Sequence, residues 1–349
     1  MNPLRTKSLT TALLLAALLV APTAWAGDTT KESLLLKDMK AKDLKQTGWD
    51  VSLSIGATLA VAQSSNVVGR IDGTSFTFGA NLKAGLNYIK AVHEWRNKLL
   101  LTNTFTRTPA LDVFAKTNDI VSFDSIYLYK LKAVPWLGPF ARAQLDTTLF
   151  PGYDFRAAPT DYVIDAGTAN ARVFTSDQLR LTDPFSPLTL RQSIGVFAKP
   201  LSRTWLNVEI KAGFGARETF ADGQLALADD DATANQVEVK ALSDFAQGGP
   251  VGNLLLTGTL SSKRVSYSFE AEVFVPVIKD SDKSAGDLTN VLFDFNISFK
   301  LVSWASLDYQ FKAVRDPQLV DHFQIQNNLL LTFAYTLLES DQGKKKAKK

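Results

Sequence analysis

The chain has 349 residues, with 38 basic and 35 acidic side chains, a net charge of +3 and no cysteine. A charge this close to balance excludes nucleic-acid binding on charge alone. The lack of cysteine excludes disulfides, thiolate metal sites and a lipid-anchored cysteine. Because 22 phenylalanines stand against 2 histidines, the composition favours a structural or transport role over hydrolysis, and we expect no cofactor and no enzymatic activity.

The N-terminus carries the pattern of a secretory signal peptide. Arg5 and Lys7 precede an apolar run over residues 12–21, and Ala24-Trp25-Ala26 follows as a small-x-small cleavage site. An uncleaved membrane anchor is the alternative, but the run is shorter than the roughly 20 residues that a spanning helix needs. We therefore predict a signal peptide over 1–26, cleaved after Ala26, and an exported protein.

The mature chain changes its periodicity at Trp49. Residues 27–47 are polar and helix-prone, which predicts a periplasmic segment. From Trp49 onward, apolar and polar residues alternate; Phe293, Phe295 and Ile297, for example, alternate with polar neighbours. No later stretch could form an apolar spanning helix, so an exported chain that is 46% hydrophobic is predicted to close as a β-barrel.

The alternation predicts an all-β fold, an antiparallel transmembrane barrel of twelve strands over residues 48–339. The expected strands cover 49–63, 74–90, 94–107, 119–132, 137–150, 188–199, 204–216, 235–260, 265–277, 289–302, 306–315 and 322–338. An even number returns both ends of the barrel to the same side. The eighth strand is over-long and contains Gly248-Gly249-Pro250, which favours a bulge or a break there. Counts of ten or fourteen strands stay open.

The connections alternate in length, as they do in outer-membrane barrels. The short connections, expected on the periplasmic side, are 91–93, 133–136, 200–203, 261–264 and 303–305. The long connections, expected outside the cell, are 64–73, 108–118, 151–187, 217–234, 278–288 and 316–321. Among them, loop 151–187 is the one expected to constrict a lumen.

Tryptophan positions agree with this topology. Beyond the signal peptide, every tryptophan falls at the start of the barrel or beside a short turn: Trp49, Trp95, Trp136, Trp205 and Trp304. Tryptophan prefers the boundary between membrane and water. These residues are predicted to form a membrane-interface belt on the periplasmic rim, whereas the core of a soluble β-protein would scatter them along the strands.

Charged residues at lumen-facing positions form the candidate functional site. By alternation they are Lys83, Arg96, Lys98, Asp124, Lys130, Arg142, Asp146, Arg191, Lys211, Glu270, Glu272, Asp294, Lys300 and Lys312. Their order along the strands predicts an interior that is basic near the periplasm and acidic near the outside, with Arg191 as an exception. The charges either line a pathway for small polar or anionic solutes or neutralise one another in a closed interior.

Chemistry-bearing motifs are weak. Asp321-His322 could be half of a protease-like site, but a solvated loop pair is the preferred interpretation, and His93 falls in a turn. Loop 278–288 resembles a calcium loop without its bidentate acid, because Val291 stands in that place. Asp229-Asp230-Asp231 could hold a divalent cation or bridge lipopolysaccharide, but solvated acidic loops are the default. No metal site is expected.

Several short segments, in their order and spacing, resemble a Gram-negative envelope family known as domain of unknown function 3078. They are Gly48-Trp49, Gln63-Ser64-Ser65, His93-Glu94-Trp95, Lys116-Thr117-Asn118-Asp119, Tyr127-Leu128-Tyr129-Lys130, Phe150-Pro151-Gly152-Tyr153-Asp154-Phe155 and Ser186-Pro187-Leu188-Thr189. The resemblance covers most of 48–338 and implies a β-barrel-like outer-membrane protein without catalytic residues to carry over. One departure is the end of the last strand, Leu337-Leu338 rather than an aromatic residue, followed by a basic tail over 340–349 that is expected to be disordered.

The sequence thus predicts an outer-membrane barrel that is a narrow porin-like channel for small polar or anionic solutes. The alternatives are a non-conducting structural or adhesion barrel that acts through its outer loops and, more remotely, an outer-membrane hydrolase. Expected partners are outer-membrane lipid and lipopolysaccharide, the barrel-insertion machinery and small solutes, and no nucleic acid.

Overall fold

The computed structural model describes residues 47–64, 73–169, 171–228, 236–260, 264–302, 304–318 and 320–339. The predicted signal peptide, the periplasmic segment up to residue 46, the acidic run 229–231 and the basic tail 340–349 lie outside these residues, so the predictions about them stand as predictions. Within the described ranges, no helix has the length and apolar character needed to cross a membrane.

All regular structure in the described residues is β-strand. The strands are β1 (Gly48–Ser64), β2 (Gly73–Lys90), β3 (His93–Thr108), β4 (Leu111–Tyr129), β5 (Leu137–Thr147), β6 (Gly152–Ile164), β7 (Arg172–Thr182), β8 (Leu188–Ser202), β9 (Asn207–Phe220), β10 (Leu225–Leu227), β11 (Gln236–Ala241), β12 (Phe245–Leu260), β13 (Val265–Phe274), β14 (Ile278–Lys279), β15 (Asn290–Val302), β16 (Ala305–Asp316) and β17 (Val320–Glu339).

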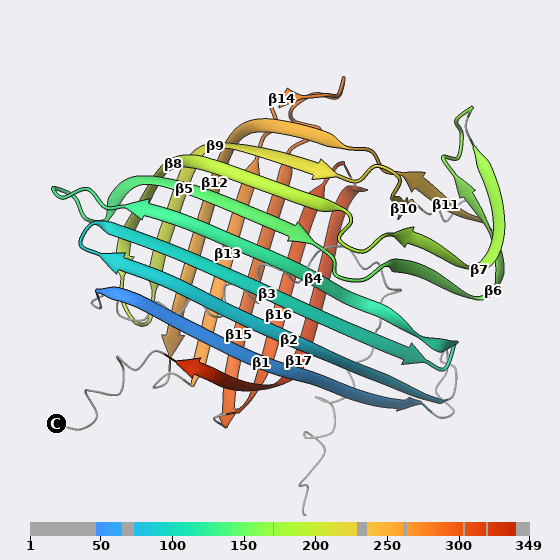
Figure 1. The fold of residues 1–349 in the computed structure, drawn as a ribbon, viewed down its shortest axis with the longest axis horizontal. Coiled ribbons are helices and arrows are strands. Elements are labelled where there is room, and N and C mark those ends of the chain that lie inside the picture. The colour runs from blue at the N-terminus through green and yellow to red at the C-terminus, as the bar shows by residue number, and fades with distance from the viewer. Residues whose placement is uncertain are drawn as a thin grey trace, which may run out of the picture.

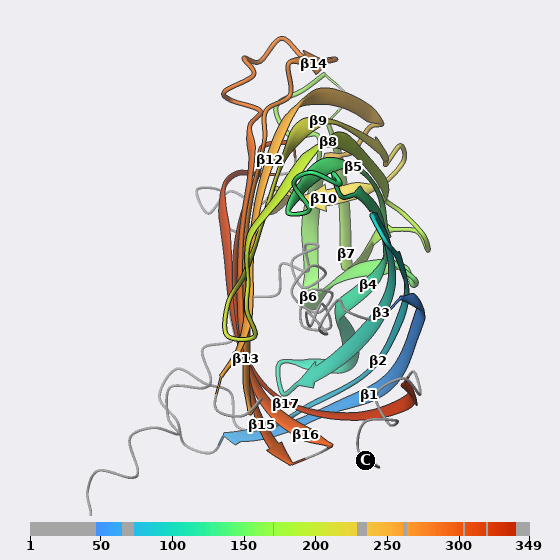
Figure 2. The ribbon, with the colours of Figure 1, turned by 90° about the vertical axis from the view of Figure 1, so that its left-hand side faces the viewer.

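Twelve of these strands close into a barrel (Figures 1 and 2). The ring runs β13-β15-β16-β17-β1-β2-β3-β4-β5-β8-β9-β12, and pairing of β12 with β13 closes it. The pairs that join the first strand to the last and to the second, β1–β17 and β1–β2, are antiparallel, as is the closing pair β12–β13. The prediction of a twelve-stranded antiparallel barrel is confirmed.

The alternation of the sequence becomes an outward apolar face and an inward polar face. On β15, Phe293 is 38% exposed, whereas its neighbour Asp294 is fully buried in the barrel interior. On β2, ten residues separate the outward rings of Phe78 and Tyr88. At about 3.3 Å per residue and a tilt of about 40°, they span roughly 25 Å along the barrel axis. That height matches the apolar band of an outer-membrane barrel.

The long eighth strand of the prediction divides at a different place from the one expected. Residues 235–260 form β11 and β12, and the chain leaves the sheet over 242–244. Gly248-Gly249-Pro250 instead pairs continuously with β9. A Cβ on Gly249 would come within 1.8 Å of the Val275 carbonyl oxygen, and the Pro250 carbonyl accepts the Val275 N–H at 3.0 Å. The glycine therefore permits a close backbone approach rather than a break.

Two of the long connections and the first part of the predicted eighth strand form a second sheet that the sequence did not predict. Strands β6 and β7, from the connection 151–187, join β10 and β11 in the order β10-β11-β6-β7. Tyr162, Val237 and Val239 form its buried apolar centre. The Tyr162 hydroxyl donates to Asp154 at 2.8 Å, and burial, reinforced by this hydrogen bond, raises the pKa of Tyr162 to about 12.

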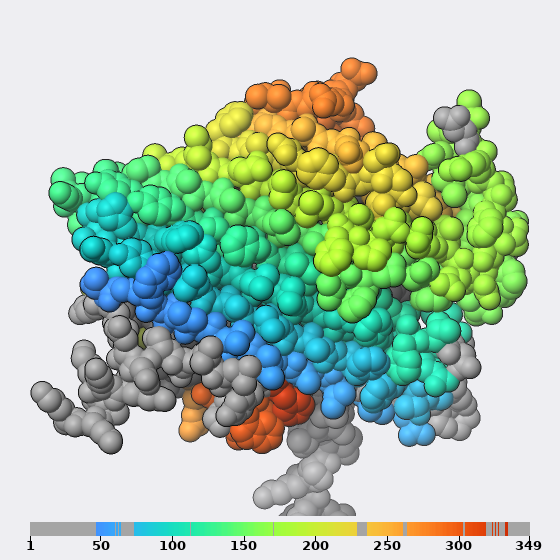
Figure 3. Space-filling model, viewed as in Figure 1, coloured from blue at the N-terminus to red at the C-terminus, as the bar shows by residue number. Residues whose placement is uncertain are grey.

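This small sheet lies across the outer mouth of the barrel. Figure 1 shows β6 and β7 beyond the end of the barrel, and Figure 3 shows them as a separate lobe there. Figure 2 looks along the barrel and shows β6, β7 and β10 inside the outline of the ring. Asp119 holds the connection to the barrel by accepting the backbone N–H groups of Leu149 and Phe150 at 3.0 and 2.7 Å. The position agrees with the expectation that loop 151–187 narrows access to the lumen.

Candidate functional site in the barrel lumen

Most of the predicted lumen residues are buried inside the barrel. Less than a tenth of the residue is exposed for Lys98, Asp124, Asp146, Lys211, Glu270, Asp294 and Lys312. Arg96, Lys130, Arg142 and Glu272 have side chains that are 13 to 17% exposed. Lys83 and Arg191 are half-buried, and Lys300 is exposed near the short-turn end. These residues make the interior strongly charged. Whether their charges can contact a solute depends on how they pair with one another.

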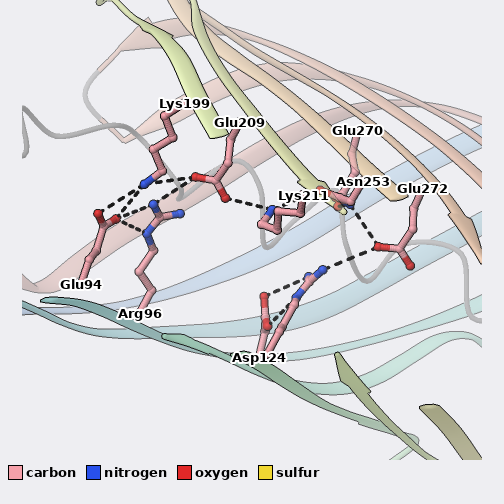
Figure 4. Close-up of polar contacts among 10 residues, drawn as sticks. Glu94, Arg96, Asp124, Lys199, Glu209, Lys211, Asn253, Glu270 and Glu272 are labelled. Atoms are coloured by element: carbon pink, nitrogen blue, oxygen red, sulfur yellow. Dashed lines mark hydrogen bonds and ion pairs between the residues drawn. The ribbon is translucent and has the colours of Figure 1, made fainter. Parts of the chain in front are cut away.

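A first group of ion pairs, here called the periplasmic cluster, comprises Glu94, Arg96, Lys130, Lys199, Glu209 and Lys211. Figure 4 labels all of them except Lys130. Glu94 and Glu209 are almost completely buried. Glu94 pairs with Arg96, with Lys130 at 2.7 Å and with Lys199 at 3.2 Å. Glu209 pairs with Arg96 at 3.1 Å, Lys199 at 3.3 Å and Lys211 at 2.9 Å. Each buried carboxylate is therefore neutralised by three cations.

A second group, the central cluster, lies farther along the barrel. It comprises Asp124, Arg142, Asn253, Glu270 and Glu272. Arg142 donates two hydrogen bonds to Asp124, at 3.0 and 3.2 Å, and lies 3.6 Å from Glu272. The Lys211 ammonium donates to Asn253 at 3.1 Å, and Asn253 donates to Glu272 at 3.1 Å and to Glu270. Lys211 thus joins the two clusters, as Figure 4 shows.

Three of the ion pairs in the interior cross the lumen, whereas others join residues of one strand or of neighbouring strands. Arg96 on β3 reaches Glu209 on β9, and Arg142 on β5 reaches Glu272 on β13. Near the outer end, Arg217 on β9 pairs with Asp316 on β16 at 2.7 Å. Three strands of the ring separate the partners in each of these pairs. The ion pairs therefore fill part of the interior at three positions along the barrel.

The predicted separation into a basic and an acidic half holds only in part. Four cations stand against two carboxylates in the periplasmic cluster, and three carboxylates stand against one cation in the central cluster. Glu94 and Glu209 lie among the cations at the periplasmic end, and Arg142 lies among the acids. The physical reason is that buried charges need partners of opposite sign. Glu94 could have been found, because it stands two residues before Arg96 and so faces the same side of β3.

Apolar side chains fill the interior beside the periplasmic cluster. Ile126, Leu128, Phe140 and Phe197, from β4, β5 and β8, form one buried group. The Lys199 ammonium lies 5.5 Å from the centre of the Phe197 ring. The alternation pattern alone does not reveal this group. Its apolar residues lie on the inward face, where the pattern predicts polar ones.

The inward face of β1, β2 and the outer half of β3 is different. We call it the hydroxyl wall, and its members carry hydroxyl or amide groups: Ser52, Ser54, Thr58, Thr77, Asn81, Thr104 and Thr106. All of them are half-buried or exposed, whereas inward residues such as Asn253, Ser268 and Asn296, on β12, β13 and β15, are buried. Lys83 lies on the same wall, opposite Ser54 in the register. Water can therefore reach the interior along this wall.

The tryptophans lie at one end of the barrel, as predicted. Trp49, Trp95, Trp136, Trp205 and Trp304 are 50, 39, 51, 55 and 57% exposed, respectively. The ring centres of Trp49 and Trp95 are 6.2 Å apart, and Trp49, Tyr88, Trp95 and Tyr127 stand in one register row across β1 to β4. An interfacial role for these residues, and contact with lipopolysaccharide or the insertion machinery, stay predictions.

The weaker motifs do not assemble into a reaction centre in the described residues. The Nδ1 atom of His93 is 2.5 Å from the Tyr127 hydroxyl oxygen at the exposed rim. His322 belongs to β17, but its side chain lies outside the described part. In loop 278–288, Asp287 accepts hydrogen bonds from Ser284. In the described residues, no group of three or more His, Cys, Asp or Glu side chains could hold a metal ion.

Comparisons with known proteins agree with this architecture. The model of the family "Protein of unknown function (DUF3078)" matches residues 72–153, which confirms the predicted resemblance over that part of the chain. A bilayer requires the strands that span it to close into a ring with an apolar outer band. The chain folds as a closed antiparallel β-barrel whose apolar outer face suits a bilayer. No curated protein matches its sequence.

Solved structures that resemble the barrel differ strongly from it in sequence. The translocator domain of autotransporter NalP from Neisseria meningitidis is 9% identical and has a TM-score of 0.37; the match covers 87% of this chain and 93% of that one. The COG4313 outer membrane channel from Pseudomonas putida F1 is 10% identical, with coverage of 83% and 95% and a TM-score of 0.34. OprB from Pseudomonas putida is 10% identical, with coverage of 90% and 97% and a TM-score of 0.29.

Proposed function

We propose that this outer-membrane barrel is a narrow channel for small polar solutes, which pass along the hydroxyl wall. The observation that carries the proposal is the asymmetry of the interior. Paired charges and apolar side chains fill the side formed by β4 to β16 in the ring, while Ser54, Thr58 and Asn81 stay accessible on the other side. A filled structural barrel has no reason to leave one wall open.

The size of the barrel is consistent with a narrow pathway. Twelve tilted strands enclose a backbone ring roughly 24 Å across, which leaves a bore on the order of 10 Å before long side chains occupy it. The cross-lumen ion pairs take up part of that bore. The remaining passage therefore admits only narrow solutes, whose width is at most that of one or two rings.

The chemistry of the wall favours polar over strongly charged solutes. Serine and threonine hydroxyls donate and accept hydrogen bonds, so they can replace the water around an uncharged polar solute. The cations of the periplasmic cluster are bound to Glu94 and Glu209, and engaged charges attract a passing anion less than free ones. Lys83, which stands opposite Ser54 on the open wall, adds a positive charge beside the passage and is expected to give a weak preference for anions.

Single-channel recording tests this proposal. Purified, refolded protein in a planar lipid bilayer is expected to give discrete conductance steps, with a reversal potential that shows weak anion preference under a salt gradient. Lys83→Gln is expected to abolish that preference while the steps persist, and Lys300→Gln, at an exposed position near the short-turn end, serves as the matched control. A folded, inserted barrel that shows no steps above the baseline would make the non-conducting interpretation the correct one.

A further inference from the structure

A row of cations and amides crosses five neighbouring strands near the outer end of the lumen. In the register, Gln144 on β5 stands opposite Arg191 on β8, and Arg191 stands opposite Arg217 on β9. Arg217 stands opposite Gln247 on β12, and Gln247 stands opposite Lys279 on β14. Neighbours in such a row lie about 5 Å apart and on the same face of the sheet. Three cations and two amides are thus brought side by side.

The row faces the interior beneath the small sheet. Gln144, Arg217 and Gln247 are 8, 8 and 4% exposed, and Arg191 and Lys279 are half-buried. The Arg217 guanidinium lies 5.1 Å from the centre of the Phe245 ring, at the residue where β12 begins. Three residues, 242–244, connect β12 to β11 of the small sheet. The row thus lies near the outer end of the lumen, two residues below the row of Asp146, Thr189 and Thr219.

Two buried groups in the row have unused hydrogen-bonding atoms. Neither amide atom of Gln247 has a hydrogen-bond partner in the described part of the chain, and the same holds for Nε of Arg217. A buried polar group without a partner destabilises the folded state, so such groups in native proteins are expected to meet water, an ion or a ligand. Gln247 and Arg217 are register neighbours, so their free N–H groups can converge on one acceptor.

The charge balance shows which acceptor fits. Arg217 also donates to Asn290 at 3.1 Å and pairs with Asp316, and Arg191 interacts electrostatically with the same carboxylate. Asp146, two residues from Gln144 on β5, accepts from Ser122 at 2.7 Å. Against the three cations of the row, these two carboxylates leave one positive charge in excess. An anion with several acceptor oxygens would neutralise it and satisfy the unused donors.

We propose that this row, which we call the outer cation row, is a binding site for the oxyanion group of a small solute, a carboxylate or a phosphate. The proposal goes beyond the channel function and does not require conduction. Arg217 Nε and the Gln247 amide donate to the anion, while Arg191 and Lys279 supply charge from either side. Bound at the outer mouth, such a solute is held where the hydroxyl wall begins to lead inward.

Anion-dependent stability of the barrel in detergent tests the proposal without measuring transport. A ligand that binds only the folded state raises its stability by RT ln(1 + [L]/Kd). Inorganic phosphate and acetate, each compared with chloride at constant ionic strength, are expected to raise the unfolding temperature with a saturating dose dependence. A larger effect of one anion identifies the preferred group.

The double substitution Gln247→Leu with Lys279→Gln retains the Arg217–Asp316 ion pair and is expected to remove the oxyanion effect. The matched control, Lys300→Gln at the opposite end of the barrel, is expected to keep it. Equal stabilisation of the double variant and the wild type, or no difference between oxyanions and chloride in the wild type, would overturn the proposal. A barrel that binds phosphate but never conducts would support the proposed anion site and contradict the proposed channel function.

Discussion

Replacement of Ser54 and Thr58 by tryptophan is expected to abolish conduction through a barrel that still folds. Both side chains lie on β1 and face the interior, in register with Lys83 and Gly79 on β2. Two indole rings on this wall fill the space that the small side chains leave, while the opposite side of the lumen is already occupied by ion pairs. We expect single-channel conductance to fall at least tenfold or to disappear.

The matched control is Leu59→Trp, on the same strand but on its outward face. Leu59 is 58% exposed on the apolar outer surface, where a tryptophan meets lipid rather than the pathway. Conductance of this variant is expected to equal that of the wild type. If the Ser54→Trp, Thr58→Trp variant inserts normally and conducts like the control, the pathway does not follow the hydroxyl wall.

Removal of the Glu209 carboxylate is expected to cause a large loss of stability. In the wild type this buried group contacts Arg96, Lys199 and Lys211. Glu209→Ala leaves the four cations of the periplasmic cluster with a single carboxylate, that of Glu94, which contacts Arg96, Lys130 and Lys199. Loss of one partner from a buried ion pair costs about 3–5 kcal/mol, and we expect a loss in this range in urea unfolding of the barrel in detergent or lipid.

Glu218→Ala provides the comparison on the same strand. Glu218 is half-buried on β9 and forms no ion pair within the described residues, so its loss is expected to cost less than about 1 kcal/mol. A second variant, Glu209→Gln, keeps the volume and some hydrogen bonds but loses the charge, and is expected to be intermediate. If all three variants unfold at the same urea concentration, the ion pairs do not support the interior as described.

The sequence predicted the barrel well because the membrane imposes a strict rule on each strand. The period of two from Trp49 onward sorts residues to lipid or to the interior, and all twelve predicted barrel strands overlap observed ones. The small outer sheet was missed for the opposite reason. Outside the bilayer, β6 and β7 need no apolar outer face, and β11 pairs in parallel with β6, a long-range contact that no local pattern encodes.

The candidate site shows the same limit. Alternation placed Arg96, Asp124 and Arg142 in the lumen correctly, because their direction depends on the strand alone. The partners of these residues come from strands across the ring, so sequence spacing could not bring Glu209 to Arg96 or Glu272 to Arg142. The sequence also does not reveal the open wall, because Ser54 and Thr58 carry no charge and only the fold leaves them more exposed than Ser268 and Asn296.

Accessibility of single cysteines tests the central claim most directly, because the natural chain has no cysteine. A cysteine is placed on the open wall at Ser54 or Asn81, on the filled side at Ser268 or Asn296, or on the lipid face at Leu59. In liposomes, a charged, membrane-impermeant thiol reagent is expected to modify Ser54→Cys and Asn81→Cys at least tenfold faster than the other three. Equal rates at all five positions, or rapid reaction at Ser268→Cys with none at Ser54→Cys, would contradict a barrel whose lumen is open along β1 and β2.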